Sequence, residues 1–266
     1  MTRVAVVGHV EWVDFVPVDR FPLRGSVVHA QGSFTRAAGG GGVAAGALAE
    51  LGATVEFFTA LGQDAPGEAA VAQLSERGVR MHVAWREPPT RRAMTLLEPG
   101  GERTIVTIGE RLEPRGEDAL PWELLRECGG VYFTAGDVAA LTAARQAPAV
   151  VASPRGRSAL VDGDVRIDAL VFSAHDEDET EWARRSADRA RLLVATEGAA
   201  GGHWWGAESG RWAAVPPPGP PRDSYGCGDS FAAAFTLGLG SGKSVAEATA
   251  LGAKVGARCL TRVGAP

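Results

Sequence analysis

Glycines, hydroxyls and carboxylates are concentrated in residues 223–231, which read D-S-Y-G-C-G-D-S-F and precede an alanine-rich run at 232–239. The run predicts a helix, and the first amides of a helix have no partners inside it and carry partial positive charge. Gly226 and Gly228 lack a Cβ, so an anion could approach this backbone closely. Asp229 lies beside that place. The pattern suits phosphoryl transfer to a hydroxyl, in which amides stabilise the moving group and the carboxylate accepts the proton. The alternative is a glycine turn with Asp229 as a helix cap.

The composition limits the class of protein. The chain has 266 residues, 45% hydrophobic and 22% charged, which suits one large α/β domain or two small ones. The formal net charge of −5 argues against nucleic-acid binding. We expect no membrane partner, because no apolar run reaches the length of a membrane span and the N-terminus lacks a signal-peptide pattern. Cys128, Cys227 and Cys259 are odd in number and widely spaced, so we expect a reducing, cytoplasmic location.

The stretch 223–231 resembles the C-terminal signature of the PfkB, or ribokinase-like, carbohydrate kinases, which usually reads D-T-T-G-A-G-D-S-F. The chain matches it at Asp223, Gly226, Gly228, Asp229, Ser230 and Phe231, and departs from it at Ser224, Tyr225 and Cys227. The resemblance implies that Asp229 is the catalytic base and that the amides of Gly226, Cys227 and Gly228 form the anion hole. Asp223 and Ser224 resemble the family's monovalent-cation loop, so stimulation by potassium is left open.

Residues 38–52 form a second glycine-rich stretch, in which four glycines open a run of alanines and leucines that ends at Gly52. The run predicts a helix with a glycine at its C-terminal end. It is similar to the family's N-terminal signature, G-G-x-x-x-N-x-A-x-x-x-A-x-L-G. The resemblance places Gly40 and Gly41 at the sugar site. It also puts Val43 where a sugar-binding Asn is expected, so one hydroxyl contact is missing or comes from elsewhere.

A substrate-binding carboxylate is expected near residues 8–25. In the family this region has a Gly, then the substrate-binding Asp, then Pro-x-x-Gly, and the chain matches the pattern at Gly8, Pro22 and Gly25. Aligned without a gap, the family's Asp falls on Val13, and Asp14 comes one residue later. Either Asp14 serves after a small shift or Glu11 takes the role. A surface position remains the alternative for both carboxylates.

Residues 90–108 read as two β runs joined at Pro99-Gly100-Gly101, which is a hairpin signal. By resemblance, about 90–109 and about 10–36 form a small β lid over the sugar. Arg91, Arg92 and Arg103 either hold a substrate phosphate or carboxylate as bidentate donors or are lid-surface charges paired with Glu98 and Glu102. Lid strands of this family often pair between subunits, so a homodimer through an exposed lid edge is a further expectation.

Two more motifs concern the nucleotide and its metal. Thr196, Gly198 and Gly201 follow the apolar run 192–195 and match the family's T-x-G-x-x-G, which lines the phosphates of ATP. The acidic run 176–179 lies where the family's N-x-x-E organises magnesium through water. No Asn is present there. Without a gap, the first and last positions of the motif fall on Ser173 and Asp176; after a shift, they fall on Asp176 and Glu179. A solvated acidic helix start is the competing interpretation.

Strand and helix patterns alternate along the chain, which predicts an α/β fold. The resemblance covers nearly the whole sequence and implies one domain over residues 1–266, a ribokinase-like three-layer α/β/α arrangement with a mostly parallel central sheet. It implies an ATP- and Mg²⁺-dependent phosphotransferase that acts on a hydroxyl of a small sugar or sugar-like substrate. The alternatives are a nucleoside kinase of the same fold and a non-catalytic nucleotide- or sugar-binding regulator. Val43 and the altered N-x-x-E region favour the regulator, whereas the intact G-C-G-D opposes it.

Overall fold

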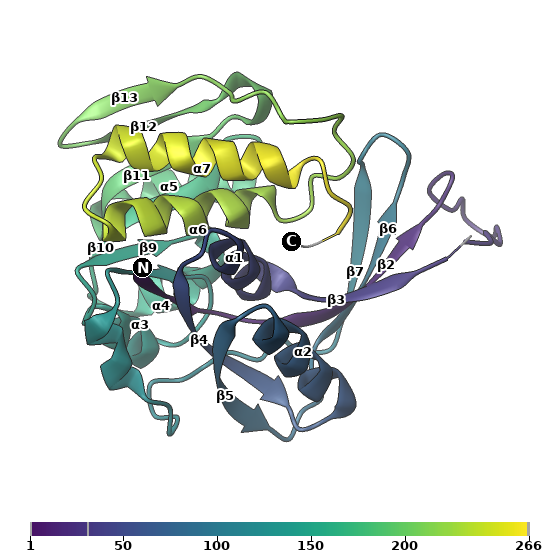
Figure 1. The fold of residues 1–266 in the computed structure, drawn as a ribbon, viewed down its shortest axis with the longest axis horizontal. Helices are drawn as coiled ribbons and strands as arrows, with labels where there is room; N and C mark the ends of the chain where they lie inside the picture. The colour runs from purple at the N-terminus through teal and green to yellow at the C-terminus, as the bar shows by residue number, and fades with distance from the viewer. Residues whose placement is uncertain (1, 31, 265–266) are drawn as a thin grey trace.

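A nine-stranded sheet forms the centre of the protein in a computed structural model that describes residues 2–30 and 32–264 (Figure 1). Its strand order is β13-β12-β11-β10-β9-β8-β1-β4-β5. The strands are β1 (Arg3–Val7), β4 (Thr54–Gly62), β5 (Val79–Arg86), β8 (Gly130–Phe133), β9 (Ala149–Ala152), β10 (Ile167–Ser173), β11 (Ala190–Thr196), β12 (Gly202–Gly206) and β13 (Ser209–Trp212). All pairs from β11 to β5 are parallel, whereas β12 and β13 are antiparallel. The mostly parallel sheet predicted from the sequence is therefore confirmed.

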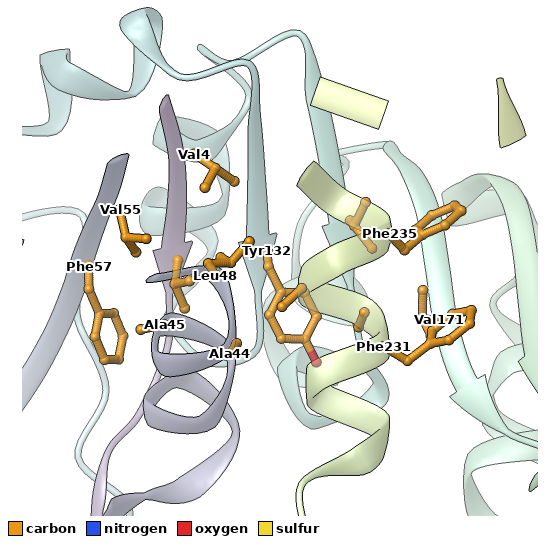
Figure 2. Packing of buried hydrophobic residues seen from close by; sticks show 14 of the residues in the cluster. Val4, Ala44, Ala45, Leu48, Val55, Phe57, Tyr132, Val171, Phe231 and Phe235 are labelled. Atoms are coloured by element: carbon orange, nitrogen blue, oxygen red, sulfur yellow. The ribbon is translucent and has the colours of Figure 1, made fainter. Parts of the chain in front are cut away.

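Helices cover both faces of this sheet. One face packs against α1 (Gly39–Glu50), α2 (Ala65–Glu76), α6 (Cys227–Gly240) and α7 (Val245–Cys259), and the other against α3 (Val138–Ala144), α4 (Arg157–Asp162) and α5 (Glu177–Arg185). Short 3₁₀ turns lie at Trp122–Glu127, Pro154–Gly156, Ala187–Arg189 and Gly198–Ala200. Successive strand residues point to opposite faces, so Val4 and Val6 pack with α1 and α6 while Ala5 and Val7 pack with α3 (Figure 2). This arrangement is the predicted three-layer fold.

A separate four-stranded sheet, called the lid below, projects from one end of the main sheet (Figure 1). Its order is β3-β2-β6-β7, with β2 at Glu11–Pro17, β3 at Phe34–Ala38, β6 at Arg92–Leu97 and β7 at Arg103–Ile108. The β6–β7 turn contains Gly100 and Gly101, both with positive φ, as the hairpin pattern predicts. One lid face packs Val13 and Phe15 against Val43 and Tyr225, so this face lies toward the main body.

The hairpin of β12 and β13 is absent from the sequence predictions. Its residues, G-H-W-W-G and S-G-R-W, combine glycines with large aromatic side chains and do not alternate between apolar and polar. Trp204 and Trp212 are partly buried against the main core, so tertiary packing determines these strands. Within the residues described, no helix is both long enough and apolar enough to cross a bilayer.

Candidate functional site

Two helix N-termini meet at one cleft beside the lid. Neither α1, which begins at Gly39, nor α6, which begins at Cys227, has a side-chain cap. They lie so close that a Cβ added to Gly40 would be 3.1 Å from Oδ1 of Asp229 in the first turn of α6. The positive ends of both helix dipoles therefore converge there. The cleft has a volume of about 360 Å³, and Gly39, Gly40 and Gly226 line it.

Charged side chains form most of the remaining cleft wall. Two carboxylates and four guanidinium groups line it: Glu11, Asp229, Arg91, Arg103, Arg111 and Arg155. Three of these residues come from the lid or its edge, namely Glu11, Arg91 and Arg103. Ile105 and Thr107 of β7 complete that side. The wall is thus positively charged, and the chain as a whole carries the opposite net charge of −5.

The turn before α6 holds its amides in an unusual conformation. Gly226 has φ +73°, and a Cβ there would lie 2.7 Å from Cγ1 of Val43, so both backbone angle and packing require glycine. The amide of Cys227 donates to Ser224 O at 3.4 Å. Within the described part of the chain, the amides of Gly226, Gly228 and Asp229 make no hydrogen bond. The turn therefore offers free donors to an anion.

Asp229 is half-buried on this cleft and is held by a tyrosine from the main sheet. The hydroxyl of Tyr132 donates to its Oδ1 at 2.9 Å. Burial, followed by the charge of Asp229, raises the pKa of Tyr132 well above its ordinary value, so the hydroxyl remains a donor. Figure 2 shows the Tyr132 ring between α1 and α6. Oδ2 of Asp229 has no hydrogen bond to any described residue and is available to a ligand.

Arg155 follows β9 and faces the same carboxylate across the cleft. The negative charge of Asp229 raises the pKa of Arg155 above its ordinary value, against the effect of desolvation. Sequence reasoning missed both Tyr132 and Arg155, because a tyrosine in a buried strand is usually part of the core and an arginine in a loop is usually solvated. Their positions at the carboxyl ends of neighbouring parallel strands are the signal that could have found them.

His9 and Glu11 form the buried floor of the cleft. The amide of Gly40 donates to Nε2 of His9 at 3.4 Å, and Oε1 of Glu11 lies 3.9 Å from the same nitrogen. Burial, reinforced by Arg111, Arg155 and Arg91, lowers the pKa of His9 well below its ordinary value. Burial raises the pKa of Glu11, although Arg91 opposes this effect from 3.3 Å. His9 is therefore neutral at pH 7.

Acidification is expected to destabilise the protein through His9. The unfolded chain takes up a proton near pH 6.5, whereas the folded chain keeps His9 neutral there. The free energy of unfolding should therefore fall below about pH 6.5, by at most about 1.4 kcal/mol per pH unit. Urea unfolding between about pH 7.5 and about pH 5.5 measures this dependence.

The comparison with His9→Asn isolates the contribution of His9. It is needed because Glu11 has the opposite effect: the protein loses stability as the pH rises through the raised pKa of Glu11. Exposed His29→Asn is the control, and an unchanged pH slope in His9→Asn would contradict the assignment.

The two candidate carboxylates of β2 lie on different faces of the lid. Glu11 lines the cleft, whereas Asp14 is three residues along the strand on the outer face and its Oδ2 pairs with Nη2 of Arg92 at 2.8 Å. Arg91 and Arg103 line the cleft and Arg92 does not. We therefore keep Glu11, Arg91 and Arg103 in the proposal below and leave out Asp14 and Arg92.

The glycine-rich start of α1 contributes unequally to the cleft. Gly40 lines it, but Gly41 lies against the aromatic ring of Phe57 and the carbonyl of His9, where a Cβ would come within 2.8 and 2.7 Å. Val43 is buried under Gly226 and Tyr225 and does not line the cleft. Its methyl groups thus support the turn before α6.

The predicted nucleotide turn joins β11 to β12. Thr196 ends β11 and donates its hydroxyl to Phe172 O at 3.2 Å. Gly198 and Gly201 have positive φ, at 55° and 90°. At Gly201 a Cβ would also lie 2.1 Å from Trp212 O, so this glycine lets β13 approach. The turn lies at the carboxyl end of the parallel strands, where α/β sheets bind ligands.

The acidic run caps α5. Oδ1 of Asp176 accepts from Glu179 N at 3.0 Å, and Oε2 of Glu179 accepts from Ser173 N at 2.9 Å. Burial is the largest cause of the raised pKa of Glu179, and Asp229 adds to it. Among the residues described, no three His, Cys, Asp or Glu side chains are grouped closely enough to hold a metal directly. Asp176 is thus a helix cap, and the charges of Arg155 and Asp229 on the cleft act on the pKa of Glu179.

Asp223 is almost fully buried and stabilises the chain around the α6 turn. Its Oδ1 accepts from Tyr225 N and its Oδ2 from Gly264 N, both at 2.9 Å. The hydroxyl of Ser224 accepts from Nη1 of Arg103. A side-chain contact with Cys259 and burial raise the pKa of Cys227, so its thiol stays protonated and is no nucleophile.

Comparisons with known proteins identify the family of this chain. The model of the pfkB family carbohydrate kinases matches residues 1–147 and 167–266. The acarbose 7(IV)-phosphotransferase of Actinoplanes sp. is 29% identical over 292 residues, covering 98% of this chain and 92% of that protein.

Two solved structures share the fold. Ribokinase of Arabidopsis thaliana, complexed with ribose and ATP, has a TM-score of 0.77 at 21% identity and covers 100% of this chain and 95% of its own. Adenosine kinase of Sinorhizobium meliloti has a TM-score of 0.79 at 19% identity, and the match covers 99% of this chain and 94% of the adenosine kinase chain. The family match extends over both glycine-rich stretches, the lid and the nucleotide turn. The chain belongs to the PfkB family of carbohydrate kinases, which are ATP-dependent phosphotransferases.

Proposed function

We propose that this protein transfers the γ-phosphoryl group of ATP to a hydroxyl of a small sugar-like substrate, with Asp229 as the general base. The observation that carries the proposal is the position of Asp229, on the cleft and beside the free amides of the α6 turn. A carboxylate that accepts the hydroxyl proton and amides that stabilise developing charge are the two parts such a transfer needs. The acarbose phosphotransferase and the ribokinase complexed with ribose and ATP support a sugar-like acceptor.

The partners of Asp229 suit the role of a base. Tyr132 holds Oδ1, which leaves Oδ2 to accept the proton of the substrate hydroxyl. The free amides of Gly226 and Gly228 then face the transferred phosphoryl group, together with Arg103, which donates to neighbouring Ser224. Such donors stabilise the transition state without reorganising, because the backbone already holds them in place.

For the nucleotide, we propose that Thr196, Gly198 and Gly201 lie along the phosphates of ATP. Magnesium fits Glu179 through water better than directly, because Ser173 N already occupies one carboxylate oxygen and no direct ligand cluster is present among the described residues. When bound, the ion neutralises phosphate charge. Asp223 accepts hydrogen bonds from two backbone amides and so orders the loop before α6. Replacing potassium by sodium in the assay tests whether that loop needs a monovalent cation.

ADP release in the presence of ATP and magnesium tests the function against a panel of sugars, sugar phosphates and nucleosides. Turnover with sugar-like acceptors supports the proposal, and turnover confined to nucleosides identifies a nucleoside kinase. The charged wall of the cleft, with Ile105 as its one aliphatic side chain among the described lining residues, favours the sugar-like acceptor. Ligand binding without turnover across the panel would instead identify a regulator.

We further propose that the chain is one domain whose lid closes over the acceptor and pairs with a second copy. Strand β7 is an edge strand, and Met94, Val106 and Ile108 expose apolar side chains on the outer lid face. Exposed apolar edges favour strand pairing between chains. Sedimentation at micromolar concentration should show a dimer that Val106→Lys dissociates, and a wild-type monomer would reject the pairing.

A further inference from the structure

More arginines than carboxylates line the cleft. We propose that the acceptor carries an anionic group, a phosphate ester or a carboxylate, which Arg91, Arg111 and Arg155 bind around Glu11. The inference rests on the proposed function and specifies its substrate class. Four arginines and two carboxylates line the cleft of a chain that has 27 Lys and Arg against 32 Asp and Glu. Charge of one sign in a cleft raises the local concentration of opposite ions.

Three of the arginines are grouped. Arg91, Arg111 and Arg155 come from three different segments, yet all three act on the pKa values of both His9 and Glu11. Each lowers the pKa of His9, which indicates that all three guanidinium groups lie near the cleft floor. An anion between these guanidinium groups would be attracted by all of them, whereas a neutral hydroxyl would not.

Two of these arginines have unused donors. Nε of Arg91 is buried 3.3 Å from Oε1 of Glu11, whereas its Nη1 and Nη2 make no hydrogen bond or ion pair with any described residue. In the part of the chain that the structure describes, the side chain of Arg155 makes neither a hydrogen bond nor an ion pair. By contrast, Arg111 is already bound to Glu113, with Nε 2.6 Å from Oε1. A guanidinium carries five N–H donors in a planar fork that matches carboxylate and phosphate oxygens.

The fourth arginine of the cleft, Arg103, lies near the α6 turn rather than beside Glu11. Arg103 lies at the far end of the lid hairpin, donates to Ser224 and lies 5.9 Å from the ring centre of Tyr225. It is therefore next to the α6 turn and the transferred phosphoryl group. Arg91 and Arg111 instead act on Glu11 at the start of β2, so we assign their charge to the substrate itself.

Binding of matched anionic and neutral partners tests the inference. Calorimetry compares fructose 6-phosphate with fructose and gluconate with sorbitol, so the two pairs distinguish phosphate from carboxylate. A saturating non-hydrolysable ATP analogue with magnesium occupies the phosphoryl position and prevents the anion from binding there. In the wild type, one anionic partner should bind about tenfold or more tightly than its neutral counterpart.

Arg91→Gln should reduce that advantage about tenfold, because it removes a charged donor and keeps a polar side chain. The matched control is Arg92→Gln, one residue away on the outer lid face and paired with Asp14, which should keep the advantage. Arg155→Gln repeats the test from another segment in case Arg91→Gln fails to fold. Its control is Arg157→Gln, because Arg157 is also exposed but does not line the cleft. Equal binding of charged and neutral partners by the wild type, or an advantage that survives both cleft substitutions, would overturn the inference.

ADP release measured on the same proteins keeps the two proposals apart. Turnover with neutral and charged acceptors alike supports the proposed function and counts against the anionic substrate. No turnover with any acceptor counts against phosphotransfer, while calorimetry still decides the charge preference of the cleft.

Discussion

Asp229→Asn is expected to lower kcat by about 10²–10⁴-fold while ATP binding persists. Asparagine has nearly the same shape, and its side-chain oxygen can still accept from Tyr132, but it cannot take the proton of the attacking hydroxyl. The structure also argues against a capping role, because Gly226 is the residue before α6 and no backbone amide donates to the Asp229 carboxylate among the described residues. ADP release gives kcat, and nucleotide binding by calorimetry gives the ATP affinity.

The control for this substitution is Asp137→Asn. Asp137 caps α3 by accepting from Ala140 N at 2.7 Å and does not line the cleft. Asparagine is as good a helix cap as aspartate, so this variant should keep its turnover. Should Asp229→Asn turn over as fast as Asp137→Asn, Asp229 is not the base.

Gly226→Ala is expected to lower kcat by about 10²-fold, the typical cost of losing one donor of an anion hole. The new Cβ would lie 2.7 Å from Cγ1 of Val43 at a φ of +73°. The turn must therefore move, and its amides would no longer point toward the transferred phosphoryl group. Left-handed backbone costs a non-glycine residue about 1–2 kcal/mol, so steady-state kinetics should be accompanied by urea unfolding.

Two further variants separate strain from the loss of catalysis. Gly242 has a φ of +75° in the turn between α6 and α7 with open space around it, so Gly242→Ala carries the backbone strain alone and should keep kcat. Adding Val43→Ala to Gly226→Ala removes the contact and should restore part of the turnover. Equal kcat in Gly226→Ala and Gly242→Ala would show that the position of the α6 turn does not matter for catalysis.

Local sequence predicted the parts of the fold that depend on neighbouring residues. The glycines at the starts of α1 and α6, the Gly100-Gly101 turn and the buried strands follow from propensity and spacing over a few residues. The hairpin of β12 and β13 did not, since its Trp204 and Trp212 are ordered by contact with the core.

Some residues of the candidate site could likewise be predicted from local sequence, and others could not. Asp229 and Gly226 were predicted because the proposed base and the proposed anion hole belong to one short stretch. The choice between Glu11 and Asp14 was left open, because residues three apart in a strand point to opposite faces and only the pairing of β2 with β6 decides which face meets the cleft.

By itself, then, the sequence determined the family, the layered fold and the carboxylate beside a glycine turn, because each is written in residues adjacent along the chain. Only the tertiary structure decided that Tyr132 holds Asp229, that Val43 supports the turn and that Arg91, Arg111 and Arg155 share one cleft. These residues are far apart in sequence. The parallel sheet places Tyr132 and Arg155 at the carboxyl ends of neighbouring strands, whereas Arg91 and Arg111 flank the lid strands β6 and β7.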